Sequence, residues 1–195
     1  SLIQNACNGF KPDIIINLAA YPRVSLVEQY PVLATEGMIQ GLINTLNYNV
    51  KKYIHVSSSN VYGSYQDDAT EESRLSPINL YGSLKVAQER LIQANCRNVG
   101  SNYIILRPMC VFGNYDLGDR LVPKFITQAI KNQEIFYATD TVTNITYIDD
   151  MVQAMKLAIE SDVVDETFNV SSGVMTDVKS LAADIKKYYD SVSSL

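Results

Sequence analysis

Two neighbouring stretches, YIHVSSSNVYG (residues 53–63) and SPINLYGSLKVAQERL (residues 76–91), indicate how this chain folds. The first opens with a short apolar run, typical of a strand buried in a sheet, and continues into a serine-rich turn. In the second, Leu80, Leu84, Ala87 and Leu91 recur at helical spacing, which predicts an amphipathic helix. A buried strand, a turn and a helix in this order predict one step of an α/β fold.

The same alternation extends along the chain. Further apolar runs typical of parallel strands are DIIINL (13–18), NYIILR (102–107) and TFNVS (167–171). Helical periodicity predicts helices over about 31–48, 121–130, 151–158 and 177–189, with Asp149 and Asp150 as N-caps of the third. Such alternation implies right-handed crossovers, so the predicted fold class is α/β, a doubly wound parallel sheet with helices on both faces.

Composition limits the classes of protein to which the chain can belong. Its 195 residues, 47% of them hydrophobic, predict a single domain over residues 1–195. A net charge of −5 argues against nucleic acid or an anionic membrane as partner. No apolar run reaches 18 residues and no signal-peptide pattern opens the chain, which predicts a cytoplasmic protein.

The three cysteines, Cys7, Cys96 and Cys110, are odd in number and never form a Cys-x-x-Cys pair. Neither a disulfide framework nor a zinc site is therefore predicted, and we expect no metal.

A tyrosine and a lysine on the predicted helix suggest proton chemistry. Tyr81 and Lys85 lie four residues apart, so their side chains are neighbours on one face, and the ammonium favours the phenolate form. Such a phenol can exchange a proton with a carbonyl or alcohol oxygen, while a serine hydroxyl at the end of the preceding strand can donate to the same oxygen. Ser57, Ser58 and Ser59 also suit a simple turn, so this role stays open at this point. A second Tyr-x-x-x-Lys match, Tyr48 to Lys52, lies in NYNVKKY, where asparagines and the next strand end any helix.

Seven segments together carry a resemblance to a known family: INLAA (16–20), YIHVSSSNVYG, TEES (70–73), SPINLYGSLKVAQE, LRPMCVFG (106–113), ITYIDDMVQA (145–154) and ETFNVSSG (166–173). With them the chain resembles the extended short-chain dehydrogenase/reductases, the NAD-dependent epimerase/dehydratase group that acts largely on nucleotide sugars. The resemblance implies a Rossmann-like domain with NAD or NADP as cofactor, and substrate-binding elements interleaved from about residue 111 to 165.

The resemblance also implies roles for individual residues. Ser58, Tyr81 and Lys85 would be catalytic, with Tyr81 as the acid/base and Lys85 also orienting the nicotinamide ribose. Cofactor contacts are implied for Ala19, Ala20, Ser57, Tyr81, Lys85 and Pro108, and substrate contacts for Ser59, Asn60, Cys110 and Arg120. For the two alanines and the proline, an ordinary role at strand ends stays open.

One departure from the family concerns the cofactor. The fold holds the dinucleotide pyrophosphate in a glycine-rich turn after its first strand. None of the nine glycines forms such a turn, so the chain is expected to be an internal segment that lacks the N-terminal part of the fold. We expect weak cofactor binding by these 195 residues alone, and the choice between NAD and NADP stays open.

Other departures concern the substrate and the reaction. Thr143 and Asn144 stand where the family often has an arginine for the substrate diphosphate, and Arg120 or Lys124 is a possible substitute. Met38 and Cys110 replace asparagines that are common in the family. A dehydratase usually has an acidic pair directly after the catalytic Ser or Thr; here Ser59 and Asn60 occupy these places, which favours an epimerase or reductase.

Three functions therefore stay open. The first is an NAD(P)-dependent epimerase or reductase of a nucleotide sugar. The second is a non-catalytic relative that binds a nucleotide or a protein, and the third is a reductase of a non-sugar ketone. The resemblance further implies a homodimer formed through the helices around 31–48 and 79–97.

The remaining polar candidates have simpler interpretations. His55, the only histidine, has apolar neighbours in a predicted strand, which favours a structural role. Four carboxylates in the loop SYQDDATEESRLSP are expected to form a solvated acidic face: Asp67, Asp68, Glu71 and Glu72. Either Glu71 or Glu72 also matches a glutamate that the family often carries in this loop.

Overall fold

The computed structural model describes residues 2–48, 50–64, 69–116, 118–138 and 141–192. The chain forms two compact units, each described here by itself. The first comprises Ser1–Pro108 with Gln153–Val170, and the second comprises Met109–Val152 with Ser171–Leu195.

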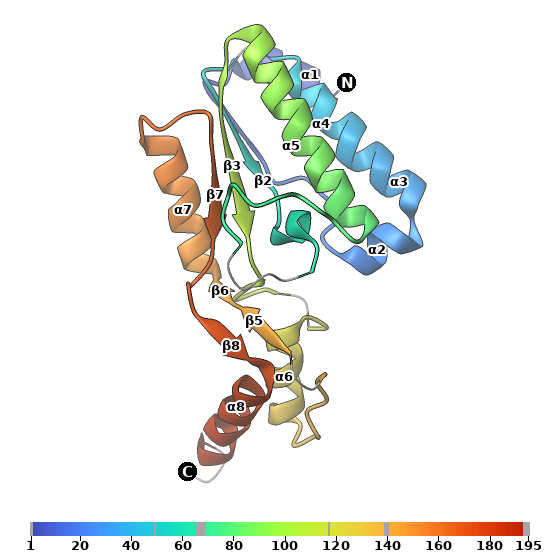
Figure 1. Ribbon diagram of the computed structural model, residues 1–195, viewed down its shortest axis with the longest axis vertical. Coiled ribbons are helices and arrows are strands. Elements are labelled where there is room, and N and C mark those ends of the chain that lie inside the picture. The colour runs from blue at the N-terminus through green and yellow to red at the C-terminus, as the bar shows by residue number, and fades with distance from the viewer. Residues whose placement is uncertain (1, 49, 65–68, 117, 139–140, 193–195) are drawn as a thin grey trace. The chain divides into compact units, whose positions relative to one another are not determined.

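A four-stranded parallel sheet forms the centre of the first unit (Figure 1). Its strands are β1 (Ile14–Asn17), β2 (Lys52–Val56), β3 (Asn102–Pro108) and β7 (Glu166–Val170), in the order β1-β2-β3-β7. Ile16 lies opposite Ile54, and Ile54 lies opposite Ile104. The prediction of a doubly wound, Rossmann-like parallel sheet is confirmed, and the four predicted strands match the observed ones within one residue at each end.

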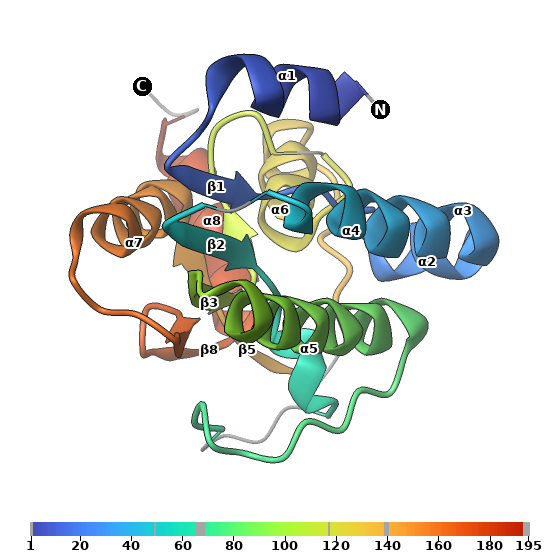
Figure 2. The same cartoon turned by 90° about the horizontal axis from the view of Figure 1, so that it is seen from above.

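Helices cover both faces of this sheet. One face carries α2 (Val24–Gln29), α3 (Pro31–Thr35), α4 (Gly41–Leu46) and α5 (Leu80–Val99), while residues 153–160 of α7 (Ile148–Glu160) lie across the sheet from α4 and α5 (Figures 1 and 2). An additional helix, α1 (Leu2–Phe10), precedes β1. The core between α4, α5 and the sheet consists of buried Leu42, Leu46, Val50, Tyr53, Ile92 and Cys96.

The predicted helix over 31–48 is divided. A π-helical turn, η1 (Glu36–Gln40), separates α3 from α4. The wider turn leaves backbone carbonyls without their usual helical donors, and the buried amide of Gln88 donates to the carbonyl of Met38 at 2.8 Å. The side-chain amide of Gln88 on α5 thus stabilises the π-helical turn. Hydrophobic periodicity in the sequence does not reveal this turn.

The prediction that Asp149 and Asp150 are N-caps of α7 is wrong. This helix begins at Ile148, so Asp149 and Asp150 lie inside its first turn and neither is the N-cap. Carboxylates are still favourable there, because the N-terminus of a helix carries partial positive charge.

The second unit has short strands and two helices. β4 (Val111–Phe112) pairs with β6 (Thr146–Tyr147), and β5 (Val142–Asn144) pairs with β8 (Met175–Asp177). Helix α6 (Leu121–Ile130) packs against α8 (Val178–Val192) through Phe125, Val178 and Ala182. Strands of two or three residues were not predicted, because they are too short to show a period.

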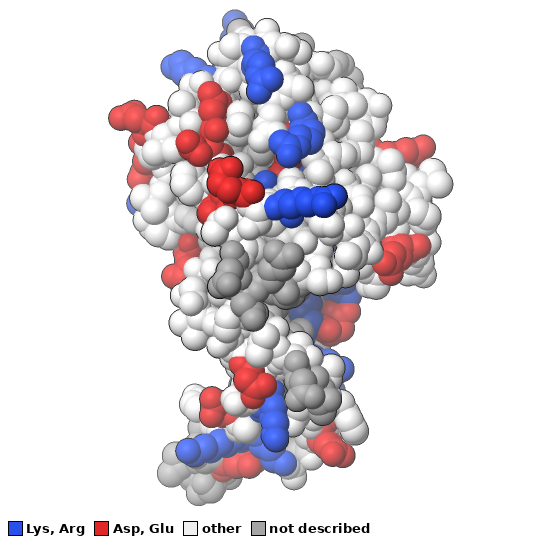
Figure 3. Space-filling view, in the orientation of Figure 1, with Lys and Arg blue, Asp and Glu red and all other residues white. Residues whose placement is uncertain are grey.

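On the face drawn in Figure 3, acidic and basic side chains are interspersed over both units. Among the described residues, no helix combines the length and the apolar character needed to cross a bilayer.

Candidate active site

Lys85 is the centre of the candidate site. It lies on α5 and only 2% of its surface is exposed, yet its ammonium reaches the carboxyl end of β2 and donates to the Val56 carbonyl at 2.8 Å. Burial lowers the pKa of Lys85 to about 8, although the nearby carboxylate of Glu89 raises it. The helix thus presents a buried ammonium whose pKa lies well below that of an exposed lysine.

Tyr81 lies one helical turn before Lys85, as predicted. The lysine Nζ is 5.8 Å from the centre of the Tyr81 ring. Tyr81 is half-buried and packs against an apolar cluster that contains Val27, Met38 and Leu84. The pair therefore shares one face of α5, and the ammonium approaches the aromatic ring.

A close backbone approach brings this part of α5 to the serine turn. Asn79 caps α5 by accepting the backbone N–H of Gly82 at 2.8 Å. A Cβ on Gly82 would lie 2.5 Å from the carbonyl oxygen of Asn60, so only glycine allows the contact. Gly82 directly follows Tyr81, and the contact holds the tyrosine next to the turn that bears Ser58.

Ser58 begins that turn. It is the N-cap of the 3₁₀ helix η2 (Ser59–Tyr62), and its Oγ accepts from the backbone N–H of Asn60 at 3.2 Å and from the Asn60 side chain at 3.1 Å. A hydroxyl that accepts two hydrogen bonds still has its own proton to donate. Ser59 and Asn60 are half-buried in the same turn, so the structure brings the predicted catalytic residues and these two neighbours together.

The other predicted cofactor residues lie at strand ends. Ala19 follows β1, and its backbone N–H donates to the side chain of Asn17 at 2.9 Å. Ala20 packs against the same apolar cluster as Tyr81, while Pro108 ends β3 opposite Val170. The small alanines thus lie at the carboxyl edge of the sheet, where open α/β sheets bind their ligands.

Two predicted substrate residues, Cys110 and Arg120, belong to the second unit. The carbonyl of Cys110 accepts the backbone N–H of Thr146 at 3.0 Å, and burial raises the pKa of its thiol. Arg120 Nε lies 3.7 Å from the carboxylate of Asp116. Both residues therefore make contacts within their own unit.

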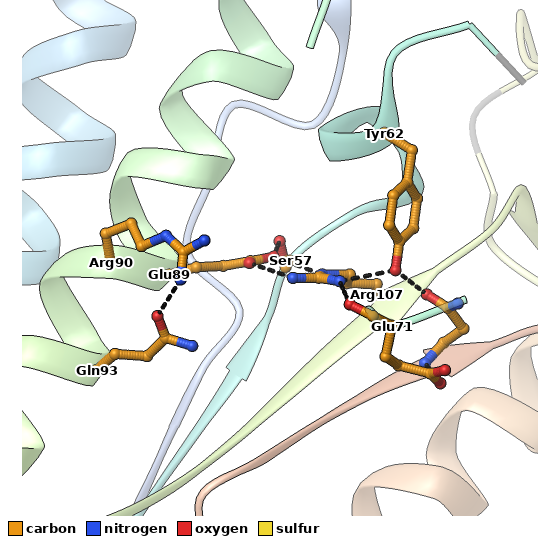
Figure 4. A network of polar contacts seen from close by, with 8 residues as sticks. Ser57, Tyr62, Glu71, Glu89, Arg90, Gln93 and Arg107 are labelled. Atoms are coloured by element: carbon orange, nitrogen blue, oxygen red, sulfur yellow. Dashed lines mark hydrogen bonds and ion pairs between the residues drawn. The ribbon is translucent and has the colours of Figure 1, made fainter. Parts of the chain in front are cut away.

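A buried polar network that was not predicted lies beneath the serine turn. Glu89 is completely buried, and its carboxylate accepts two hydrogen bonds from Arg107, at 3.0 and 2.7 Å (Figure 4). The hydroxyl of Ser57 donates to the same carboxylate at 2.5 Å. Ser57, predicted to bind cofactor, thus has a partner in the core. The sequence did contain a signal, because Glu89 follows Lys85 by four residues and Arg107 ends an apolar strand.

The prediction of a solvated acidic face in the loop before α5 is wrong for Glu71. Glu71 is half-buried and accepts the backbone N–H of Asn169 on β7 at 2.7 Å, so it does not belong to a solvated acidic face. Glu72 is exposed, and Asp67 and Asp68 lie outside the described residues. Glu71 therefore anchors the loop to the sheet.

His55 lies within β2 and is fully buried. Burial, together with the neighbouring charge of Lys85, holds the pKa of this imidazole well below its ordinary value. His55 is therefore neutral at physiological pH. Its position in the core agrees with a structural role.

Within the described ranges, no three His, Cys, Asp or Glu side chains converge as a metal site. Cys7, Cys96 and Cys110 are free thiols.

The profile of the NAD dependent epimerase/dehydratase family matches residues 1–171. A dTDP-D-glucose 4,6-dehydratase from Dictyostelium discoideum is 29% identical over 210 aligned positions, which cover 98% of this chain and 48% of that protein. The chain thus spans about half the length of this relative.

Solved structures of similar fold include two epimerases. The UDP-glucose 4-epimerase of Thermotoga maritima, crystallised with UDP-glucose, superposes with a TM-score of 0.89 and 27% identity, over 97% of this chain and 65% of that one. The UDP-glucose 4-epimerase of Thermus thermophilus, in complex with NAD, has a TM-score of 0.87 at 23% identity, over 96% of this chain and 65% of that one.

Proposed function

Because the chain belongs to the NAD dependent epimerase/dehydratase family, we propose that it supplies the proton-transfer site of an NAD(P)-dependent nucleotide-sugar epimerase or reductase. The observation that carries this proposal is the position of Lys85, buried between the Val56 carbonyl and the Tyr81 ring beside the turn that bears Ser58. Structures of similar fold include epimerases in complex with UDP-glucose or with NAD.

The residues fit a nicotinamide dinucleotide at this edge. The ammonium of Lys85 has three N–H donors, and one of them is taken by Val56. The others suit the hydroxyls of a ribose, with Ala19 and Ala20 as small neighbours. When bound, the cofactor would exchange hydride with the substrate.

The roles of the protein groups follow from their chemistry. Tyr81 would remove the proton of a sugar hydroxyl as hydride leaves and return it in the reverse step. Lys85 would favour the phenolate through its charge, and its pKa of about 8 keeps most of the side chain protonated at pH 7. Ser58 would donate a hydrogen bond to the same sugar oxygen.

The serine turn favours an epimerase or reductase over a dehydratase. Water loss needs a group that titrates beside the sugar, and the position after Ser59 carries Asn60, an amide. The Asn60 side chain donates to Ser58 and accepts from Asn79 at 3.4 Å, so it holds the turn together. The Dictyostelium relative, by contrast, is named a dehydratase.

The test is product analysis with the full-length protein. It would be incubated with NAD and a panel of UDP- and dTDP-hexoses, and the sugars would be followed by proton NMR. We expect inversion of a ring carbon, or NAD(P)H-dependent reduction of a keto-sugar, each lost in a Tyr81→Phe variant. A 4-keto-6-deoxy product would show water loss and would refute the choice of reaction. Cofactor and sugar turnover absent under all conditions would favour the non-catalytic relative.

Asn144 favours a second candidate, the reductase of a non-sugar ketone. Its side-chain oxygen accepts from the backbone N–H and the hydroxyl of Ser172, at 3.1 and 2.9 Å. Unlike an arginine, Asn144 carries no positive charge and cannot bind a diphosphate through two charged N–H donors. Competition by UDP or dTDP distinguishes the candidates, because only a nucleotide-sugar site should be blocked by a bare nucleoside diphosphate.

The homodimer and the cytoplasmic location stay predictions. Apolar side chains at the start of α3 support the former, since Val32 is 67% and Leu33 56% exposed. Light scattering of the full-length protein at micromolar concentration measures the oligomeric state, and a monomer there would contradict the dimer.

A further inference from the structure

A buried carboxylate lies one helical turn beyond Lys85. Glu89 is fully buried on α5, and Arg107 on β3 is 4% exposed. Arg107 donates to both carboxylate oxygens through Nε and Nη2 (Figure 4). A forked pair of this kind fixes the carboxylate in one orientation. Burial opposes the charge of Arg107, but its bonds to Glu89 outweigh this effect and raise the pKa of the guanidinium.

This carboxylate holds the end of β2. The Ser57 hydroxyl donates to Glu89 at 2.5 Å, and the Ser57 backbone N–H donates to the Leu106 carbonyl at 2.7 Å. Ser57 is thus fixed through both its side chain and its backbone. Because Ser58 is the next residue, the position of its hydroxyl depends on this anchor.

The same carboxylate faces Lys85. On a helix, residues four apart are neighbours, so Glu89 supplies a negative charge to the ammonium from one turn away. Among the described residues, Tyr81 on the same helix and His55 on β2, which is neutral, also lie near Lys85. Arg107 reaches this region through its pair with Glu89.

The other contacts of Arg107 extend the anchor to the adjacent loop and strand. Its Nη1 donates to the Tyr62 hydroxyl at 2.7 Å and to the Glu71 carbonyl at 3.1 Å. Tyr62 in turn donates to the side chain of Asn169 on β7 at 2.8 Å. One guanidinium therefore joins α5, η2, the loop before α5 and the ends of two strands.

We propose that Glu89, held by Arg107, is a positioning residue that fixes the Ser57–Ser58 strand end and supplies the negative charge beside Lys85. It touches neither substrate nor cofactor in this role. The inference rests on the proposed function for its catalytic meaning, but both of its physical effects are measurable without cofactor or substrate.

The experiment measures the titration of Lys85 directly. Protein labelled with ¹³C at the lysine Cε would be titrated by NMR, with the Lys85 signal assigned from its loss in a Lys85→Met variant. In Glu89→Gln, which conserves size, the midpoint should fall by about one unit from the wild-type value near 8. Amide exchange of Ser57 and Ser58 should become faster. Glu160→Gln, which removes an exposed carboxylate paired with Lys156, is the matched control and should change neither.

A double variant distinguishes the positioning role of Glu89 from a general contribution of the buried pair to the stability of the fold. Replacing both members of the buried pair, Glu89→Leu with Arg107→Met, should recover much of the thermal stability lost in the single variants, because no unpaired charge remains. The Lys85 midpoint should still be lowered and Ser58 exchange still fast. A wild-type midpoint and wild-type exchange in this double variant or in Glu89→Gln would overturn the proposal, whatever the catalytic activity of the protein.

Discussion

Lys85 lies one helical turn after Tyr81, with its ammonium 5.8 Å from the centre of the tyrosine ring and hydrogen-bonded to the end of the neighbouring strand. This geometry has an energetic cost, because a buried ammonium loses its hydration. The Val56 carbonyl and the Glu89 carboxylate partly offset that cost. The chain therefore maintains a destabilised cation at the point where proton transfer is proposed.

Tyr81→Phe tests the proposed acid/base. The variant should lower kcat by about 10² to 10⁴, the usual contribution of a positioned acid or base, without lowering the melting temperature markedly. Turnover of the full-length protein and thermal unfolding measure the two effects. The matched control is Tyr48→Phe, since Tyr48 belongs to the Tyr-x-x-x-Lys match outside the site and its buried hydroxyl makes no hydrogen bond within the described residues. Equal turnover in both variants would remove Tyr81 from the mechanism.

Lys85→Met tests the cost of burying the ammonium. The pKa is about 8 in the folded chain and 10.5 in the reference state, so the unfolded chain binds more protons between these values and wild-type stability rises over this pH range. Below pH 8 the methionine variant should be more stable than wild type by up to about 3 kcal/mol, and the difference should vanish near pH 10.5. Urea denaturation at several pH values measures it. If Lys85→Met were less stable than wild type at pH 7, burial of the Lys85 ammonium would not destabilise the fold.

Gly82→Ala tests the close approach of α5 to the serine turn. The added methyl would lie 2.5 Å from the Asn60 carbonyl oxygen, so we expect a loss of about 1–3 kcal/mol and reduced turnover. Gly41→Ala is the control, because a Cβ there meets nothing within 4 Å and alanine favours a helix by about 0.5–1 kcal/mol. Chemical denaturation of both variants should therefore give shifts of opposite sign. If Gly82→Ala had wild-type stability and turnover, the close approach of α5 to the serine turn would not be required for either.

Lys52→Met tests the end of α7. The buried Lys52 ammonium donates to the carbonyls of Ala158 and Ser161, at 3.1 and 2.6 Å, and caps this helix. Losing hydrogen bonds to a charged donor should cost about 1.5–3 kcal/mol and speed amide exchange in the last turn. The neighbouring Lys51, paired with Asp13 at an exposed position, is the control, and Lys51→Met should leave stability unchanged. Equal stability of the two variants would argue against the cap.

Much of the fold was predictable because its signals are local. The runs predicted as strands, 13–18, 53–57, 102–107 and 167–171, are rich in apolar residues, which is typical of strands in parallel sheets. The helix over 80–99 repeats its apolar residues with helical period, and Asn79 and Gly100 mark its ends. The division of the helix over 31–48 was not predictable, because it depends on Gln88, a residue fifty positions away from Met38.

The sequence by itself determined the alternation of strands and helices and the pairing of Tyr81 with Lys85, because both follow from spacing along one segment. Only the tertiary structure decided what surrounds that pair. The carbonyl that receives Lys85, the close approach of Gly82 to Asn60 and the bond from Arg107 to Glu89 join segments distant in the chain. Hydrogen bonds and desolvation depend on distances in space, and packing alone sets these distances.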